Sequence, residues 1–489
     1  SLKPPPPSRS PDWKLLDWSI KPLPEKPGIQ LRTACYHASG KYSFVRVEQE
    51  IQVLPNGEIK TLKSAEMVGD QIIVKLPEGT SAAEVQILAA TLGGQAASKP
   101  FTTDTWLIAL PRKLEAVPQA LARITNCGVA IDYAEPNHLV RSLRTPNDPN
   151  FTNAVQWSLY NTTQLNKDIR APRAWDQRNS GFYATTNNVT NAVVVAVIDT
   201  GVRYTHEDLA ANMWKNPGET GGGKETNGND DDGNGYVDDV YGIDTYENDT
   251  NPMPGATHGT HCAGIIAAVG NNGKGLTGVA WNGVQIMALK MFGPNGESPT
   301  AISDITGCIN YAASKGAKVI NASYGGGSAN NTEAGAIYDA GQSGVIFVAA
   351  AGNGGSDNIG DNNDTAPFYP ASYTQYVIST GPNRGTYQIN NIISVGATDR
   401  NDSRTTFSNY GATSVHVAAP GSAILSTVLN HNYSYKSGTS MAAPHITGLS
   451  ILTKSVCNLS VSDLRNIILT TGVKVSGLTG KVSSGSIAN

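Results

Sequence analysis

The chain has 489 residues, more than a single hydrophobic core usually holds, so we expect two or more domains. A charged fraction of 16% together with 51 glycines is typical of a loop-rich α/β protein. The net charge of −4 disfavours a nucleic-acid partner, and no apolar run approaches the length of a membrane span.

Residues 1–66 are predicted to form a proline-rich leader followed by a β-hairpin. Eight of the first 30 residues are proline, which favours extended backbone without regular pairing. Apolar residues alternate over 42–64, and Asn56-Gly57 within this stretch is a preferred two-residue hairpin turn.

Residues 67–143 are predicted to form a small α+β domain of their own. Four strand patterns and two helix patterns follow one another in the order β-α-β-β-α-β, which is the ferredoxin-like arrangement. The strands are expected at 72–76, 95–99, 106–110 and 130–140, and the helices at 81–89 and 114–124.

Residues 144–489 alternate apolar strands with helices. Continuous apolar strands between helices predict a parallel sheet covered by helices on both faces, which is the doubly wound α/β class. Strands are expected at 193–198, 284–290, 319–323, 345–351, 392–397 and 415–418, and helices at 258–268 and 302–314. The apolar run from Met441 to Leu452 predicts a further buried helix that begins beside Ser440.

Three candidate catalytic residues stand at the ends of these elements. Asp199 ends an apolar strand, His258 begins a helix in Thr-His-Gly-Thr-His, and Ser440 begins another in Gly-Thr-Ser-Met-Ala-Ala-Pro. A serine hydroxyl needs a base to take its proton, and the free N–H groups at a helix start favour an anion forming beside it. Ser440 by itself could be only a helix cap, so the other two residues decide the interpretation.

The order Asp, His, Ser along the chain is that of the subtilisin-type triad. On these three motifs, residues 144–489 resemble the subtilisin-like serine proteases (subtilases), in particular those of the thermitase and proteinase K type. The resemblance implies that Ser440 attacks the peptide carbonyl, His258 transfers the proton, and Asp199 orients the imidazole ring.

Other histidines and a cysteine lie near these motifs. His206, His261 and His445 are alternatives for the base, but the family motif assigns it to His258, the first histidine of His-Gly-Thr-His. We expect His261 to be packed or capping and His445 to be structural. Cys262 is interpreted as a buried free thiol near the active site, because a cysteine in a helix is more often a core residue than a nucleophile.

The resemblance also implies an oxyanion site and a substrate cleft. Asn353, in Ala-Ala-Ala-Gly-Asn-Gly, would stabilise the oxyanion together with the Ser440 backbone N–H. Substrate would add as a strand to 323–325, and its side chain would enter a pocket between that strand and 350–352. The cleft residues are Ser323, Tyr324, Gly325, Ala350 and Gly352. No charge stands beside them, which predicts broad or apolar specificity, and an insertion at about 374–388 lies beside the pocket.

Residues 67–143 resemble the propeptide of subtilases, with Tyr-Ala-Glu-Pro-Asn at 133–137 as its closing motif. The resemblance implies a secreted endopeptidase made as a zymogen, with protein and peptide substrates and its own propeptide as an intramolecular inhibitor. Cleavage is expected near Leu143–Arg144, and the enzyme is expected to be a monomer. Two alternatives are a processing protease of narrow specificity and an inactive subtilase fold that serves as a binding protein.

Two sets of oxygen-bearing residues predict structural calcium. The first follows from the resemblance to thermitase-type enzymes and comprises Asp148, Asp208, Asn272 and the carbonyls of Val269, Lys274 and Leu276. The second is read from spacing, because the first half of an EF-hand loop has oxygen ligands at alternate positions and a glycine at the sixth. It comprises Asp230, Asp232, Asn234 and Tyr236, followed by Asp238 or Asp239. A solvated acidic turn is the alternative for this second set.

Overall fold

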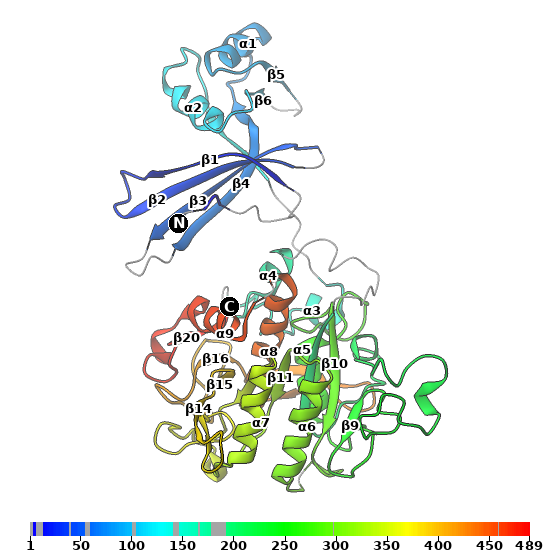
Figure 1. The fold of residues 1–489 in the computed structure, drawn as a ribbon. Coiled ribbons are helices and arrows are strands. Elements are labelled where there is room, and N and C mark those ends of the chain that lie inside the picture. The colour runs from blue at the N-terminus through cyan, green and yellow to red at the C-terminus, as the bar shows by residue number, and fades with distance from the viewer. Residues whose placement is uncertain are drawn as a thin grey trace. The chain divides into compact units, whose positions relative to one another are not determined.

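The computed structural model describes residues 3–5, 13–38, 41–53, 59–99, 104–139, 146–164, 167–177, 192–296, 298–457 and 459–489. The chain forms two compact units, Ser1–Ser142 and Leu143–Asn489, each with its own sheet (Figure 1). The predicted Asn56-Gly57 turn and the predicted cut near Leu143–Arg144 lie outside the described residues. Over the described part of the chain, none of the helices is both long enough and apolar enough to cross a bilayer.

The first unit is built on a seven-stranded antiparallel sheet in the order β1-β2-β3-β4-β6-β5, with β7 paired to β4. Its strands are β1 (Lys14–Pro22), β2 (Ile29–His37), β3 (Phe44–Val53), β4 (Ile59–Lys75), β5 (Ala96–Ser98), β6 (Thr105–Ala109) and β7 (Tyr133–His138). Its helices are α1 (Ala82–Thr91) and α2 (Ala116–Arg123).

The C-terminal part of this unit has the ferredoxin-like arrangement. The elements β4, α1, β5, β6, α2 and β7 follow one another in the predicted order, and the strands lie side by side as β7-β4-β6-β5. Helix α1 begins at a capping box, in which the Ser81 hydroxyl accepts the Glu84 N–H and the Glu84 carboxylate accepts the Ser81 N–H. Buried side chains such as Ile72, Leu88 and Ile108 form the core between sheet and helices.

Residues 14–37 were predicted as part of the leader, but they form the strands β1 and β2. The two strands pair from Lys14 opposite His37 to Pro22 opposite Gln30, so proline stands only at the end of the ladder, where no N–H is needed. Strand β4 runs across the predicted boundary at residue 66, and the two parts therefore share one sheet.

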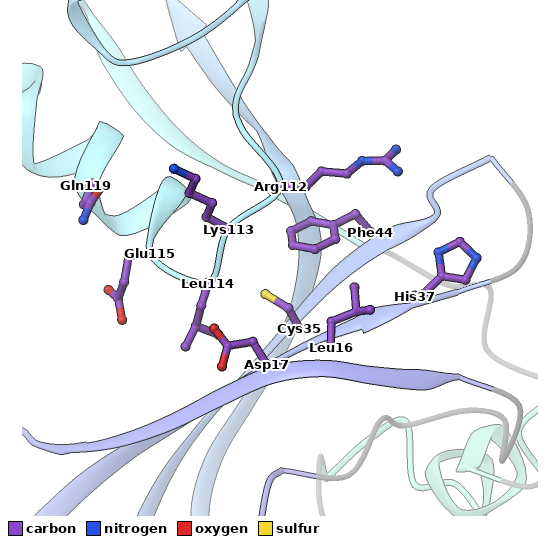
Figure 2. Close-up of a pocket in the computed structure, with 10 residues that line it drawn as sticks. All are labelled: Leu16, Asp17, Cys35, His37, Phe44, Arg112, Lys113, Leu114, Glu115 and Gln119. Atoms are coloured by element: carbon purple, nitrogen blue, oxygen red, sulfur yellow. The ribbon is translucent and has the colours of Figure 1, made fainter.

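A pocket of about 700 Å³ opens in the first unit between the β1–β3 strands and the segment before α2 (Figure 2). Cys35 and Phe44 line it, Arg112 lies on one side, and Asp17 and Glu115 lie on the other. Burial raises the pKa of the Cys35 thiol to about 11, so the thiol stays protonated and unreactive at neutral pH.

The second unit contains a nine-stranded sheet in the order β19-β20-β16-β15-β12-β11-β8-β10-β9. All neighbouring pairs are parallel except β19 and β20. The strands are β8 (Val193–Asp199), β9 (Gly242–Asp244), β10 (Val284–Lys290), β11 (Val319–Ala322), β12 (Ile346–Ala350), β15 (Ile392–Thr398), β16 (Val417–Pro420), β19 (Val473–Lys474) and β20 (Ser486–Ile487).

Helices cover both faces of this sheet, which confirms the predicted doubly wound class. The helices are α3 (Pro149–Thr152), α4 (Ala171–Gln177), α5 (His258–Ala267), α6 (Ile302–Ser314), α7 (Asn331–Gln342), α8 (Thr439–Val456) and α9 (Val461–Thr471). One core packs α4, α5, α8 and α9 against the sheet, and a second core packs α6 and α7 against the other face (Figure 1). Continuous burial of strands such as β11 and β12 follows from this double cover.

The sheet brings the predicted site residues to one edge. The adjacent parallel strands β12, β11 and β8 end at Ala350, Ala322 and Asp199, so the residues that follow them share the carboxyl edge. The predicted insertion forms the hairpin β13 (Gln375–Ile378) and β14 (Gly385–Gln388), and a second hairpin is formed by β17 (Ile424–Thr427) and β18 (Tyr433–Lys436).

Candidate active site

Asp199 and His258 form a hydrogen-bonded pair at the carboxyl edge of the sheet. Asp199 ends β8 and is buried, whereas His258 begins α5 with about a third of its side chain exposed. The ring Nδ1 lies 2.8 Å and 2.9 Å from the two carboxylate oxygens of Asp199. A side chain at Gly259 would meet the Gly201 carbonyl at 2.3 Å and Asp199 Cβ at 3.0 Å, so the helix can approach the strand only with glycine there.

The carboxylate sets the charge and the tautomer of His258. Burial lowers the pKa of His258, but the charge of Asp199 and its hydrogen bond outweigh burial, so the pKa is raised from its ordinary value. Because Asp199 accepts the Nδ1 proton, the neutral ring presents Nε2 as a free base.

Ser440 lies in the first turn of α8 and is held by two neighbours. The Ser323 hydroxyl donates to the Ser440 carbonyl at 3.0 Å, and the thiol of Cys262 donates to the same carbonyl at 3.4 Å. The Ser440 hydroxyl donates to the Ser323 carbonyl at 3.2 Å. Among the described residues, the Ser440 hydroxyl makes no hydrogen bond to His258.

Cys262 links the two halves of the site. Asp199, His258 and Cys262 each offer an atom that lies within 4.8 Å of the others, and Cys262 also contacts Ser440. The thiol is fully buried, and burial raises its pKa well above the ordinary value, so it is a neutral packing group at physiological pH. The start of α5 and the start of α8 therefore meet at one place.

Asn353 follows β12 and is exposed beside Ser440. Its side-chain oxygen accepts the Thr439 N–H at 2.8 Å and the Thr439 hydroxyl at 3.0 Å. Because these bonds fix the oxygen of the amide, the two Nδ2–H donors are turned away from Thr439 and are free to bind a developing negative charge.

The three other histidines considered from the sequence are buried and bonded to backbone carbonyls. His261 Nε2 lies 3.1 Å from the Ile424 carbonyl, and burial lowers the pKa of His261 to about 3. His445 Nδ1 lies 2.8 Å from the Met441 carbonyl of the same helix, and burial lowers the pKa of His445 to about 4. His206 is also fully buried, and burial lowers its pKa. None of the three has the exposed ring edge of His258.

The predicted cleft residues lie on two neighbouring strand ends. Ser323, Tyr324 and Gly325 follow β11, and the segment from Ala350 to Gly352 ends β12, the adjacent strand. Gly326 then pairs with Tyr369 through bonds of 2.7 and 2.8 Å in both directions. The insertion hairpin packs on α7, where the side chain of Asn331 bonds the backbone of Val377.

The first set of predicted cation ligands is brought together from three distant segments. Asp148 accepts the N–H groups of Asn271 at 2.7 Å and Asn272 at 3.1 Å, while Asp208 accepts the Leu276 N–H at 2.9 Å and the Asn272 amide at 2.8 Å. Both carboxylates are fully buried; burial raises the pKa of Asp208 to about 6, and the charge of Asp148 adds to this. In the described chain neither has a lysine or arginine partner. The remaining predicted donors are carbonyls of the same loop, at Val269, Lys274 and Leu276.

The second acidic cluster differs in membership from the one read off the sequence. Carboxylate oxygens of Glu219, Asp232 and Asp239 lie within 4.8 Å of one another. Glu219 is fully buried, and its Oε2 has no hydrogen-bond partner, whereas its Oε1 accepts the N–H groups of Asp231 and Asp232 at 2.7 and 3.1 Å. Sequence reasoning missed Glu219, because it stands well before the EF-hand-like spacing and nothing local marks it.

The remaining predicted residues of this loop lie in its backbone turns. Asp230 accepts the N–H groups of Asn234 and Gly235, and Asn234 accepts the Tyr236 N–H while donating to Asp239 at 2.8 Å. Lys315 forms an ion pair with Asp232. A buried carboxylate oxygen without a partner, facing two further carboxylates, fits a divalent cation with oxygen ligands.

Comparison with known families and structures agrees with this geometry. A family model described as the subtilase family matches residues 190–485, and a model described as the fervidolysin N-terminal prodomain matches residues 54–137. The second match begins at residue 54. The N-terminal boundary of the prodomain family is therefore earlier than residue 67, where the sequence pattern placed the start of this domain.

Individual relatives cover most of the chain. A thermophilic serine proteinase from Bacillus sp. is 36% identical over 359 residues, 73% of this chain and 72% of the relative. Thermitase from Thermoactinomyces vulgaris is 36% identical over 334 residues, 68% of this chain and 93% of the relative. A solved structure described as proteases from Pseudoalteromonas arctica is 28% identical with a TM-score of 0.52, covering 71% of this chain and 97% of that chain.

Proposed function

Because the chain belongs to the subtilase family and is a serine endopeptidase with a prodomain, we propose that Asp199, His258 and Ser440 are its catalytic triad. The observation that carries the proposal is the place of Cys262. Its sulfur lies within 4.8 Å of a ring nitrogen of His258 and donates to the Ser440 carbonyl, so the base and the nucleophile lie in one site. Asp199, bonded to the far side of the imidazole, completes the arrangement.

The reaction proceeds by two proton transfers through one ring. Ser440 Oγ bonds to the carbonyl carbon as its proton moves to His258 Nε2; that proton then passes to the amine nitrogen as the C–N bond breaks. Water repeats the sequence on the resulting ester and restores the Ser440 hydroxyl. Asp199 keeps the Nδ1 proton in place and stabilises the imidazolium that forms at each stage.

The oxyanion of the tetrahedral intermediate is stabilised by Asn353 Nδ2 and by the Ser440 backbone N–H. Thr439 holds the amide oxygen of Asn353, so the donor group is oriented before substrate arrives and no reorganisation is needed during the reaction. Removal of such a donor lowers turnover by about 10²–10³-fold.

Substrate binds as an added strand along Ser323, Tyr324 and Gly325. A substrate N–H that donates a hydrogen bond to the Ser323 carbonyl displaces the Ser440 hydroxyl, because the two donors compete for the same acceptor. The displaced hydroxyl then turns to His258. Substrate binding therefore aligns the nucleophile, which accounts for the absence of a Ser440–His258 bond among the described residues.

The first unit acts as the propeptide, that is, as a folding aid and an intramolecular inhibitor of a secreted zymogen. Its last described strand, β7, pairs with β4, and the Leu139 N–H continues this pairing by donating to the Glu66 carbonyl at 3.0 Å. His138 ends β7 and Leu139 continues its pairing, so both residues are held by the first unit. Only residues after Leu139 remain for the cleft.

Structural calcium is supported by the two clusters of carboxylates described above. Asp148, Asp208 and Asn272 would hold one ion with the carbonyls of Val269, Lys274 and Leu276. Glu219, Asp232 and Asp239 would hold a second. Calcium at these places would neutralise buried carboxylates and tie loops together, and it takes no part in the reaction. We expect the mature enzyme to act as a monomer.

The test is labelling with a fluorophosphonate, which bonds only to an activated serine. Labelling of folded protein should map to Ser440 by mass spectrometry and should vanish in Ser440→Ala and His258→Ala. Heat-denatured protein is the control, because it contains the same serine without its base. Labelling at another serine, or equal labelling after denaturation, would contradict the proposed triad.

A further inference from the structure

Each of the two segments proposed as walls of the specificity pocket contains a glycine, and an aromatic ring lies close to both glycines. A side chain at Gly325 would meet Cε1 of Phe368 at 2.3 Å and Cζ at 2.8 Å, and a side chain at Gly352 would meet its Cγ at 3.1 Å. The ring of Phe368 therefore lies close against the backbone of both walls, in the slot that separates Gly325 from Gly352.

Phe368 does not behave as a core residue. Its side chain is half-buried, and it is absent from the apolar clusters that the described residues of the second unit form. Other aromatic residues of the same segment, Tyr369 and Tyr373, do pack against the core beneath α7. The ring is therefore partly exposed to solvent, next to Gly325 and Gly352.

The backbone on both sides of Phe368 is clamped, so the ring cannot withdraw easily. Tyr369 and Gly326 exchange two backbone hydrogen bonds, at 2.7 and 2.8 Å. The Phe368 N–H donates to the Ser372 hydroxyl at 3.2 Å, and the Ser372 N–H donates to the Phe368 carbonyl at 2.9 Å. The position of the ring is thus fixed by the 323–326 segment as well as by its own loop.

We propose that Phe368 forms the floor of the primary specificity pocket and restricts the residue before the cut to small side chains, such as alanine, serine or glycine. The inference rests on the proposed function of the 323–325 and 350–352 segments as pocket walls. Glycine walls alone would leave room for a flat or long side chain, but the Phe368 ring already fills that space. A large substrate side chain would have to displace a clamped aromatic group, which excludes it by steric conflict.

The test compares peptide p-nitroanilides that differ only in the residue before the cut, with alanine, valine, leucine or phenylalanine there. Wild-type enzyme should cut the alanine substrate at least tenfold better than the phenylalanine substrate in kcat/KM. Phe368→Gly should raise the ratio of kcat/KM for the phenylalanine substrate to kcat/KM for the alanine substrate at least tenfold. Phe368→Tyr keeps the ring and is the matched control, which should retain the alanine preference.

Active enzyme is counted in each variant by fluorophosphonate titration, so loss of folding cannot imitate a change of specificity. If wild type prefers phenylalanine, or if Phe368→Gly leaves the ratio of the two substrates unchanged, the pocket proposal is overturned while the protease function stands. Failure of the proposed function has a different signature: no substrate of the series is cut and Ser440 is not labelled.

Discussion

At the scale of single residues, the reactivity of His258 depends on one carboxylate. Asp199→Asn should lower kcat by about 10⁴-fold, because the amide no longer stabilises the imidazolium and can select the wrong tautomer. The charge of Asp199 raises the pKa of His258, so its removal should lower that pKa and move the acid limb of the pH profile to lower pH.

The measurement is kcat/KM against pH for both proteins, since this quantity reports the pKa of the free enzyme. Activity requires neutral His258 and should rise as pH increases through its pKa in each case. An acid limb that stays in place in Asp199→Asn would mean that another group sets it.

Cys262 allows a second prediction at this scale. Because its thiol is neutral and makes only a weak hydrogen bond to the Ser440 carbonyl, Cys262→Ala should retain activity within about tenfold of wild type. Wild type should lose activity to a small mercurial reagent, since a metal on this sulfur crowds both His258 and Ser440, and the alanine variant should resist it.

Inhibition is measured as residual peptidase activity against reagent concentration. Cys308→Ala is the matched control, because Cys308 is equally buried but lies in α6 on the other face of the sheet; it should remain sensitive. Loss of activity in Cys262→Ala to the level of Asp199→Asn would show a chemical role for the thiol.

At the scale of elements, local pattern was sufficient for some residues and not for others. The places of Asp199, His258 and Ser440 at element ends could be predicted, because a strongly apolar strand or helix pattern adjoins each of them. Residues 14–37 were misread because their prolines suggested unpaired backbone, although Pro22 stands at a strand end and Pro24 and Pro27 lie in the connecting turn.

Other features depend on contacts that no local pattern contains. Glu219 joins Asp232 and Asp239 only through the folding of a glycine-rich loop, and its burial cannot be read from its neighbours in sequence. Phe368 reads as an ordinary loop residue until Gly325 and Gly352 are seen on either side of it. In both cases the partners come from segments that sequence spacing does not relate.

The loops that carry the carboxylate clusters give a third prediction. Removal of calcium with EDTA should lower Tm by several degrees, because an ion that binds only the folded state adds about 2.7 kcal/mol at a hundred times its Kd. Asp208→Asn and Glu219→Gln should each reduce the difference between calcium and EDTA.

Tm is measured by calorimetry with calcium and with EDTA on Ser440→Ala protein, which cannot digest itself. Glu207→Gln, beside the first cluster, and Asp231→Asn, beside the second, alter exposed carboxylates and should leave the calcium effect unchanged. Equal Tm with and without calcium in the parent protein would contradict both cation sites.

At the scale of the whole molecule, the prodomain and the pocket make a joint prediction about maturation. If the triad cuts its own chain, Ser440→Ala should accumulate as the full-length precursor, whereas wild type should yield a shorter mature enzyme. A pocket limited to small side chains favours Ser142 before the cut over Leu143, which moves the expected mature N-terminus to Leu143.

The measurement is N-terminal sequencing of the mature protein from a host without other proteases. A start at Leu143 agrees with the Phe368 pocket; a start at Arg144 contradicts the pocket but not autocatalysis. Cleavage of Ser440→Ala in the same host would contradict autocatalysis itself. Residues 1–142, added as a separate protein, should inhibit the mature enzyme at low concentration.

Strand β20 also determines when, during synthesis of the chain, the active site can form. Ile487 in β20 pairs with Ala418 and packs in the same small core as Ala351, which adjoins the pocket wall at Gly352. A ribosome must therefore have added Ile487 before that wall has its support. At a translation rate of about 5–20 residues per second, Ile487 is added about 20–70 s after the first unit has been synthesised. The first unit has its own core and its own antiparallel sheet, so it can be folded throughout that interval. The order of synthesis alone therefore delays proteolysis until the inhibitor has folded.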